Sequence, residues 1–264
     1  MTSYEKVTAA WHRIHTEHPE IYHIANPRLI TRIRHRDFAK VVHATCPLVP
    51  GSTILEAGCG SGRDSLYFSY LGYHCTAVDI DILPLEKLKR ARAVLGNDKF
   101  GKQLRLTAEQ ADIFELPFAD ASYDFVFNSG VVEHYDDATR LRLLSEMGRV
   151  TKPNGYLSVV FPNKDHVLEK YWSRLISAWT DFDSYEIPEQ PLGSSFVKSF
   201  SHVGFDVVHQ DWIDCYDTIS HFPSWLPLRA VAYLTTMILP RPPYAFRKKV
   251  GTRTIVIARK KSIT

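Results

Sequence analysis

The sequence lacks the features that mark membrane-spanning, secreted or nucleic-acid-binding chains. No stretch reaches the ~18 uncharged apolar residues needed to cross a bilayer, and the first residues lack the apolar core of a signal peptide. The formal net charge is only +3 over 264 residues, which by itself does not indicate nucleic acid as a partner. We therefore expect a cytoplasmic protein, and keep a peripheral membrane contact as an alternative.

Cysteine is scarce, and the few cysteines are not paired in the sequence. The chain has four of them, all widely spaced: Cys46, Cys59, Cys75 and Cys215. Without a C-x-x-C pair they predict neither a zinc site nor a disulfide framework. The histidines also lack metal-ligand spacing, so no metal is expected. Four histidines near the N-terminus have no evident partner: His12, His15, His18 and His23.

What the chain does contain is the composition of an ordinary globular protein. Hydrophobic residues make up 45% of it and charged residues 23%, which is typical of a chain with a substantial core. The length suits one large domain, or one domain with a cap. No internal repeat or low-complexity segment divides the sequence.

The segment 53–64, Thr-Ile-Leu-Glu-Ala-Gly-Cys-Gly-Ser-Gly-Arg-Asp, organises the rest of the chain. Its first three residues are apolar and β-branched enough to favour a short buried strand. The three glycines then break the strand, and helical spacing follows over 61–71. Glycine permits a sharp turn and the close approach of a ligand, and free N–H groups at a helix start can face that ligand. The segment therefore predicts a strand, a glycine turn that binds a ligand, and a helix.

Beyond this segment, strands and helices alternate. Strands are predicted at 53–55, 74–78, from 104–106 toward 112, 123–127, 156–161, 205–212 and 254–258. Helices are predicted at 61–71, 85–95, 137–150 and 194–203. A turn is expected at 153–155, before the fifth strand. Such alternation predicts a parallel sheet with helices on both faces.

The glycine spacing distinguishes between two classes of nucleotide ligand. A dinucleotide fingerprint, G-x-G-x-x-G, would require a glycine where Arg63 stands. The observed spacing, E-x-G-x-G-x-G from Glu56 to Gly62, instead resembles motif I of the class I S-adenosylmethionine (SAM)-dependent methyltransferases. The resemblance covers residues 52–162 strongly and the final two strands weakly. It implies a Rossmann-like, seven-stranded, mostly parallel sheet in the order 3-2-1-4-5-7-6, with a helical cap.

The resemblance also implies a set of residues that bind SAM and its product S-adenosyl-L-homocysteine (SAH). Glu56 would help to position the cationic amino-acid end, and Asp79, at the end of the second strand, would accept both ribose hydroxyls. Asp112 would accept from the adenine amino group. The full expected set is Glu56, Gly58, Cys59, Gly60, Gly62, Asp64, Asp79, Ile80, Asp112, Ile113, Asn128 and Ser129.

Glu133 and His134 follow the fourth strand, beside the expected position of the methyl group. His134 is a candidate general base near neutral pH; the alternative is that the pair only shapes the pocket.

The expected reaction is methyl transfer to a small-molecule or lipid-linked acceptor. Asn128-Ser-Gly-Val stands where the enzymes that methylate amino groups of nucleic acids carry their signature, which argues against DNA or RNA. A non-catalytic SAM-binding partner subunit and an NAD-dependent oxidoreductase are kept as alternatives.

Three segments outside the alternation are expected to cap the acceptor site. They are an N-terminal helical segment, 1–50, and two insertions, 163–192 and 215–250, in a SAM-binding domain over 51–264. An amphipathic helix is predicted from Val7 to Ile14, and another over 28–44. Two basic groups could face an anionic acceptor or lipid, or could simply be solvated: Arg28, Arg32, Arg34 and Arg36, and Arg241, Arg247, Lys248 and Lys249.

Overall fold

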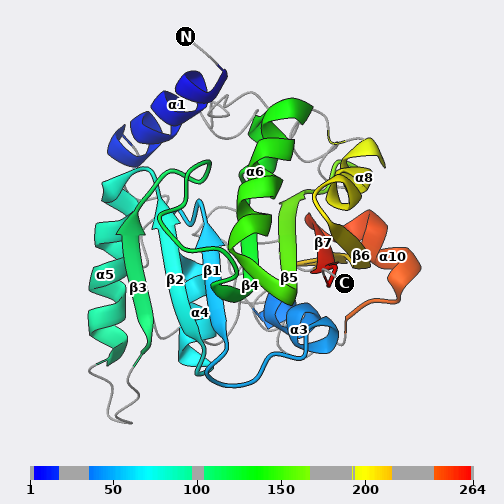
Figure 1. The fold of residues 1–264 in the computed structure, drawn as a ribbon, viewed down its shortest axis with the longest axis horizontal. Coiled ribbons are helices and arrows are strands. Elements are labelled where there is room, and N and C mark those ends of the chain that lie inside the picture. The colour runs from blue at the N-terminus through cyan, green and yellow to red at the C-terminus, as the bar shows by residue number, and fades with distance from the viewer. Residues whose placement is uncertain are drawn as a thin grey trace, which may run out of the picture.

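A computed structural model describes residues 3–17, 36–96, 104–166, 192, 194–215 and 241–262. Its core is a seven-stranded sheet in the order β3-β2-β1-β4-β5-β7-β6 (Figure 1). The strands are β1 (Thr53–Ala57), β2 (His74–Asp79), β3 (Leu106–Gln110), β4 (Tyr123–Ser129), β5 (Thr151–Pro162), β6 (Phe205–Ile213) and β7 (Arg253–Lys260). Strand β7 runs antiparallel to both of its neighbours, β5 and β6. Neighbouring strands among the first five, β1 to β5, are all parallel. The predicted order is confirmed.

The helices cover both faces of this sheet. They are α1 (Ser3–Glu17), α3 (Arg36–Thr45), α4 (Arg63–Tyr70), α5 (Ile82–Gly96), α6 (Asp137–Val150), α8 (Ser194–His202) and α10 (Tyr244–Val250), with a 3₁₀ turn η1 (Val132–His134). Side chains of α3, α4 and α5 form one apolar cluster with β1–β4, and side chains of α1, α6 and α8 form the other. Because both faces of the central strands are buried, those strands read as continuous apolar runs.

Strand β5 differs from the prediction, because it begins before the expected turn at 153–155. Its pairing with β4 jumps from Tyr123↔Thr151 to Phe125↔Tyr156, so extra residues of β5 loop out as a bulge. Asn154 in the bulge has a left-handed backbone, with φ of +62°, which asparagine tolerates better than most residues. The Pro-Asn-Gly signal therefore marks a bulge inside the strand.

The N-terminal helices bury their apolar faces in the domain. Val7 and Ile14 of α1 are 4% and 6% exposed, which confirms the predicted amphipathic helix. Of the second predicted helix, 28–44, only α3 lies within the described residues. Arg28, Arg32 and Arg34 lie outside them, as does the side chain of Arg36. Residues 167–191 and 216–240, most of the two predicted insertions, also lie outside.

Asp211 on β6 is the buried end of an ion-pair cluster that holds α10 against the sheet. Its carboxylate, with a side chain only 2% exposed, accepts from Arg247 Nε at 2.7 Å and lies 3.3 Å from Arg241 Nη2. Arg241 also lies 3.9 Å from Asp37 of α3. Arg241 and Arg247 are therefore both paired with carboxylates of the chain, which disfavours the alternative in which they face an outside anion. Among the described residues, no helix has the length and apolar character to cross a bilayer.

Replacing Asp211 with Asn should lower the free energy of unfolding by about 1–3 kcal/mol, because two guanidinium groups lose a buried carboxylate. Asp206→Asn on the same strand is the matched control. Its pair with Lys261 is exposed, so the loss should stay below about 0.5 kcal/mol. Urea unfolding measures both. Equal effects in the two variants would contradict a special role for Asp211.

Candidate active site

The predicted site residues meet at the carboxyl ends of β1, β2 and β4. Strand β1 lies between β2 and β4, so the connections that leave β1 and β4 diverge and open a crevice there. The chain leaving β1 is tied to β2, because Gly58 N and Cys59 N donate to Val78 O at 2.9 and 2.8 Å. Gly58, Gly60 and Gly62 all have positive φ, at 73°, 48° and 60°. Only glycine adopts this run of conformations without strain.

Asp79 closes the other side of the turn. Its Oδ2 accepts from Gly60 N at 2.7 Å and its Oδ1 from Asp81 N at 3.0 Å. The residue is 8% exposed, and burial raises the pKa of its carboxyl although both backbone N–H bonds act against the rise. The turn and the end of β2 are therefore held as one unit around a single carboxyl group.

Two more buried carboxyl groups lie next to the turn. Glu56, the penultimate residue of β1, is 3% exposed and accepts from Ser65 N at 3.0 Å. Asp64 stands in the first turn of α4 and is also buried. Burial, followed by the charges of Asp64 and Asp79, raises the pKa of Glu56 well above its usual value. A cationic ligand beside these groups would favour their ionised forms.

Asn128 and Ile113 pack around Gly58. Asn128 is fully buried and its Nδ2 donates to Ala57 O at 2.6 Å. A Cβ built on Gly58 would lie 2.9 Å from Val131 Cγ2, 3.5 Å from Asn128 Nδ2 and 3.8 Å from Ile113. The Oδ1 of Asn128 is buried and has no hydrogen-bond partner among the described residues. This side-chain oxygen is available to accept from a ligand N–H.

Asp112, which follows β3, is bonded to helix α1. Its Oδ2 accepts from Tyr4 Oη at 2.7 Å, and its Oδ1 accepts from Phe114 N at 2.9 Å. Burial and then the bond to Asp112 raise the pKa of Tyr4 to about 12. No sequence pattern marks Tyr4, because helical spacing predicts α1 but not the edge of the sheet that this helix reaches.

Asp81 anchors the other end of α1. It does so through two of the N-terminal histidines, so the prediction that these histidines lack partners is wrong for His12 and His15. His12 Nδ1 and His15 Nδ1 lie 3.0 and 2.9 Å from Asp81 Oδ2. Burial opposes ionisation of Asp81, but the Leu83 N–H and the two imidazoles outweigh it and lower the pKa of this carboxyl. Asp81 therefore links α1 to α5. His18 and His23 lie outside the described residues.

Glu133 and His134 lie in the 3₁₀ turn after β4, 2% and 8% exposed. Arg140 holds this turn, because its Nε donates to Val132 O at 2.9 Å. The ring of Trp11, on α1, meets His134 edge-on at a centroid distance of 5.5 Å. The structure thus places His134 below α1 rather than on an open surface.

Ser129, at the end of β4, contacts a residue that the sequence did not single out. Arg253 Nη1 donates to Ser129 Oγ at 3.0 Å, and Arg253 Nε donates to Asp214 Oδ2 at 2.5 Å. Asp214 has a left-handed backbone, with φ of +58°. No local pattern marks these residues, because β4, β6 and β7 are brought together only by the sheet order.

Comparison with known proteins agrees with this geometry. Residues 55–159 match the family model of a methyltransferase domain. Over these residues, about two-fifths of the chain, the sequence is similar to methyltransferase domains. The match covers β1 to β5, the part that forms the crevice.

Individual relatives cover part of the chain. An uncharacterised methyltransferase of Bacillus subtilis, YodH, is 36% identical over 46% of this chain and 47% of its own length. A malonyl-[acyl-carrier protein] O-methyltransferase of Erwinia billingiae is 30% identical over 59% of each. The chain thus spans about half to three-fifths of these relatives. A magnesium protoporphyrin IX methyltransferase from Synechocystis, solved with SAH, shares the fold, with a TM-score of 0.55 at 17% identity over 85% of this chain and 80% of that one.

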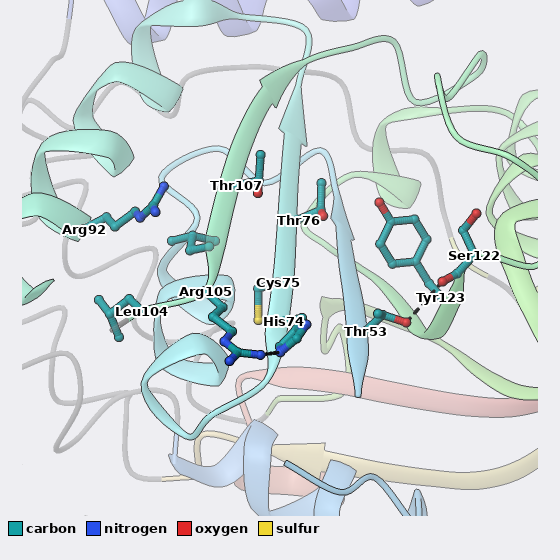
Figure 2. A pocket seen from close by; sticks show the side chains of 11 residues that line it. Thr53, His74, Cys75, Thr76, Arg92, Leu104, Arg105, Thr107, Ser122 and Tyr123 are labelled. Carbon is teal, nitrogen blue, oxygen red and sulfur yellow. Dashed lines mark hydrogen bonds between the residues drawn. The ribbon is translucent and has the colours of Figure 1, made fainter. Parts of the chain in front are cut away.

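A hollow of about 440 Å³ lies at the opposite edge of the sheet (Figure 2). It is lined by residues at the amino ends of the first four strands, among them Thr53, His74 and Tyr123, and by Arg92 of α5. None of the predicted site residues lines it. The β3–β4 connection, residues 111–122, contains no helix (Figure 1). The hollow is not the crevice at the glycine turn.

The raised pKa of Glu56 predicts that SAM binding depends on pH. If Glu56 faces the ammonium group of SAM, that group favours the ionised carboxylate, so binding should release a proton and affinity should rise as pH rises from about 4.5 through the raised pKa. Calorimetry in two buffers of different ionisation enthalpy should show this proton release. In Glu56→Gln the part of the binding enthalpy that depends on the buffer should disappear. Identical proton release in the variant would assign the effect to another group.

Proposed function

We propose that this chain transfers the methyl group of SAM to a small-molecule acceptor. The observation that carries the proposal is the junction of the glycine turn with β2, where Gly60 N–H bonds to Asp79 at 2.7 Å. It places a buried carboxyl group at the crevice where nucleotides bind in open α/β sheets. The family match over residues 55–159 supports the same reaction.

Each part of SAM has a matching group in the crevice. We propose that Asp79 accepts the ribose hydroxyls, using lone pairs beyond those bonded to Gly60 and Asp81. Glu56, with Asp64 nearby, would face the cationic amino-acid end, and Asn128 Oδ1 would accept from it. Asp112 and Ile113, with Ile80, would line the adenine. The bond from Tyr4 to Asp112 then brings α1 into this part of the site.

Bound SAM supplies a methyl group already activated by its sulfonium charge. The chain's contribution is to hold that group and the acceptor in line and to exclude water. Helix α1 supports this role, because its Trp11 packs on His134. We propose that His134 takes the acceptor's proton when the acceptor must lose one, with Glu133 beside it in the turn.

The activities of related proteins support a small acceptor. They include malonyl-[acyl-carrier protein] O-methyltransferases and, among the solved structures, a geranyl diphosphate C-methyltransferase.

We also propose a lipid-linked acceptor and a peripheral contact with the cytoplasmic membrane surface. The supporting observation is on α10, where Tyr244 and Phe246 are 52% and 55% exposed beside Lys248 and Lys249. Sedimentation with anionic vesicles tests this contact.

Neither alternative function is favoured. An NAD-dependent oxidoreductase would need the dinucleotide glycine spacing, which Arg63 interrupts. A non-catalytic SAM-binding subunit has no support in the family match. Methyl transfer from labelled SAM to a panel of acceptors separates an enzyme from such a subunit.

Asp79→Ala should weaken SAM and SAH binding, because the ribose loses charge-assisted hydrogen bonds on the order of 1.5–3 kcal/mol each before compensation. Calorimetry should show SAM and SAH binding to the wild type and no binding of NAD. Asp120→Ala, which removes a carboxylate from an exposed surface position, is the control. Undiminished SAM affinity in Asp79→Ala would contradict the assignment of Asp79 to the ribose. Tight binding of NAD would contradict SAM as the cofactor.

His134→Ala should lower the turnover rate by ~10²-fold or more if the imidazole is the general base, with SAM affinity little changed. Rates for an acceptor identified in the panel measure this. His43→Ala serves as the control, because His43 lies on α3 and is hydrogen-bonded to Tyr73. Near-normal turnover of His134→Ala would return His134 to a pocket-shaping role.

A further inference from the structure

The hollow at the amino ends of the strands is a second concave site, at the opposite edge of the sheet from the glycine turn (Figure 2). Its volume of about 440 Å³ is in the range of small-molecule pockets. Cys75, Leu104 and Leu106 give it a buried apolar wall, which belongs to the core cluster of α3, α4 and α5. Every other residue that lines it carries a hydroxyl group or a basic side chain. The hollow therefore offers hydrogen-bond donors and positive charge beside an apolar wall.

Two arginines line this hollow without a carboxylate partner in the described part of the chain. Arg105, which precedes β3, donates from Nη1 to Nε2 of His74, as Figure 2 shows. A ring nitrogen that accepts this bond carries no proton, so Arg105 keeps its positive charge and four further N–H donors. Within the described ranges, Arg92 of α5 has neither a hydrogen bond nor an ion pair. Arg149 and Arg247, by contrast, are each paired with carboxylates.

The acidic groups nearby leave the two guanidinium charges in place. Among the described residues that line the hollow, none is Asp or Glu. Glu109 of β3 is close enough to act electrostatically on Tyr123. Asp124 is already occupied, because it lies 2.8 Å from Lys152 Nζ and accepts from Thr53 N at 2.8 Å. Two like charges in one hollow repel each other, so a dianion is favoured there over a monoanion.

Hydroxyl groups form the rest of the polar wall. Thr107 of β3 is exposed, and the described part of the chain gives its hydroxyl group no partner. Tyr123, at the start of β4, is 8% exposed and lies with its hydroxyl group toward Thr76 of β2 (Figure 2). Burial raises the pKa of Tyr123, so this hydroxyl group stays protonated at neutral pH and can donate. Guanidinium and hydroxyl donors together match the oxygens of a phosphate group and of a sugar.

We propose that this hollow is a second ligand site, which binds a small phosphomonoester with a hydroxyl-bearing body, such as a sugar phosphate. Arg92 and Arg105 bind the phosphate group. Thr107 and Tyr123 bind oxygens of the body. The proposal is separate from methyl transfer, because none of these residues lies at the glycine turn.

An amide NMR titration of the whole protein tests the proposal, with ribose 5-phosphate as the probe. At about pH 7.5 the phosphate group is dianionic, and about 0.15 M salt suppresses non-specific ion binding. The probe should shift the amide resonances of Thr76, Thr107 and Tyr123 saturably, with a dissociation constant below about 1 mM. Inorganic phosphate should bind at least ~5-fold more weakly, and neutral ribose should not bind. The shifts should persist when SAH saturates the protein, because the glycine turn lies at the other edge.

Variants test which side chains hold the probe. Arg92→Met and Arg105→Met should each weaken binding of ribose 5-phosphate by ~10-fold or more, because charge-assisted hydrogen bonds are lost. Arg90→Met is the matched control, since it removes the same charge from an exposed position of the same helix that does not line the hollow. It should change the dissociation constant by less than about twofold. Thr107→Val should weaken binding of ribose 5-phosphate by ~3-fold and leave inorganic phosphate unchanged.

The amide spectrum of each variant shows whether it is folded, and its SAH affinity should stay within about twofold of the wild type. Any of five results would overturn the proposal. They are the absence of saturable shifts up to about 10 mM probe, equal binding of ribose, equal affinity for inorganic phosphate, loss of binding when SAH is added, and equal effects of Arg90→Met and Arg92→Met. Equal affinity for inorganic phosphate would indicate an adventitious ion only, and competition by SAH would place the probe at the glycine turn.

Discussion

The hydrogen bond from Gly60 N–H to the Asp79 carboxyl group is the contact on which the rest of the site depends. It forms only because Gly58 and Gly60 adopt left-handed conformations that turn the backbone back over β2. The same turn aims the start of α4 at Glu56, through Ser65 N–H. One bond therefore fixes the positions of two carboxyl groups and a helix start relative to the crevice.

Burial of acidic groups at this turn has an electrostatic cost that a cationic ligand can relieve. Desolvation disfavours the charged forms of Glu56 and Asp79 and raises the pKa of each. Backbone N–H groups offset part of this cost, which is why the glycine turn and its carboxyl groups occur together. The buried carboxyl groups of the free protein thus favour a positively charged ligand. A sulfonium cofactor fits this preference better than an anionic dinucleotide does.

The sequence was sufficient for the sheet and for the crevice, and insufficient for what surrounds them. The β/α alternation is a local signal that predicted a parallel sheet, and the glycine spacing is a local signal for the family resemblance, which implied the strand order and the meeting of Glu56, Asp79 and Asn128 at one edge. The contacts of Tyr4 with Asp112, of His15 with Asp81 and of Arg253 with Ser129 join residues far apart in the chain. Such pairs depend on how α1 and β7 dock, which no short pattern encodes. The β5 bulge was read as a turn because Pro-Asn-Gly favours both.

A crystal structure of the chain with SAH tests the central claim most directly. The account predicts the ribose hydroxyls on the Asp79 carboxylate, the amino-acid end beside Glu56 and Asn128, and the adenine against Ile113 under helix α1. SAH bound elsewhere, for example in the hollow at the amino ends of the strands, or a ribose that does not contact Asp79, would contradict it.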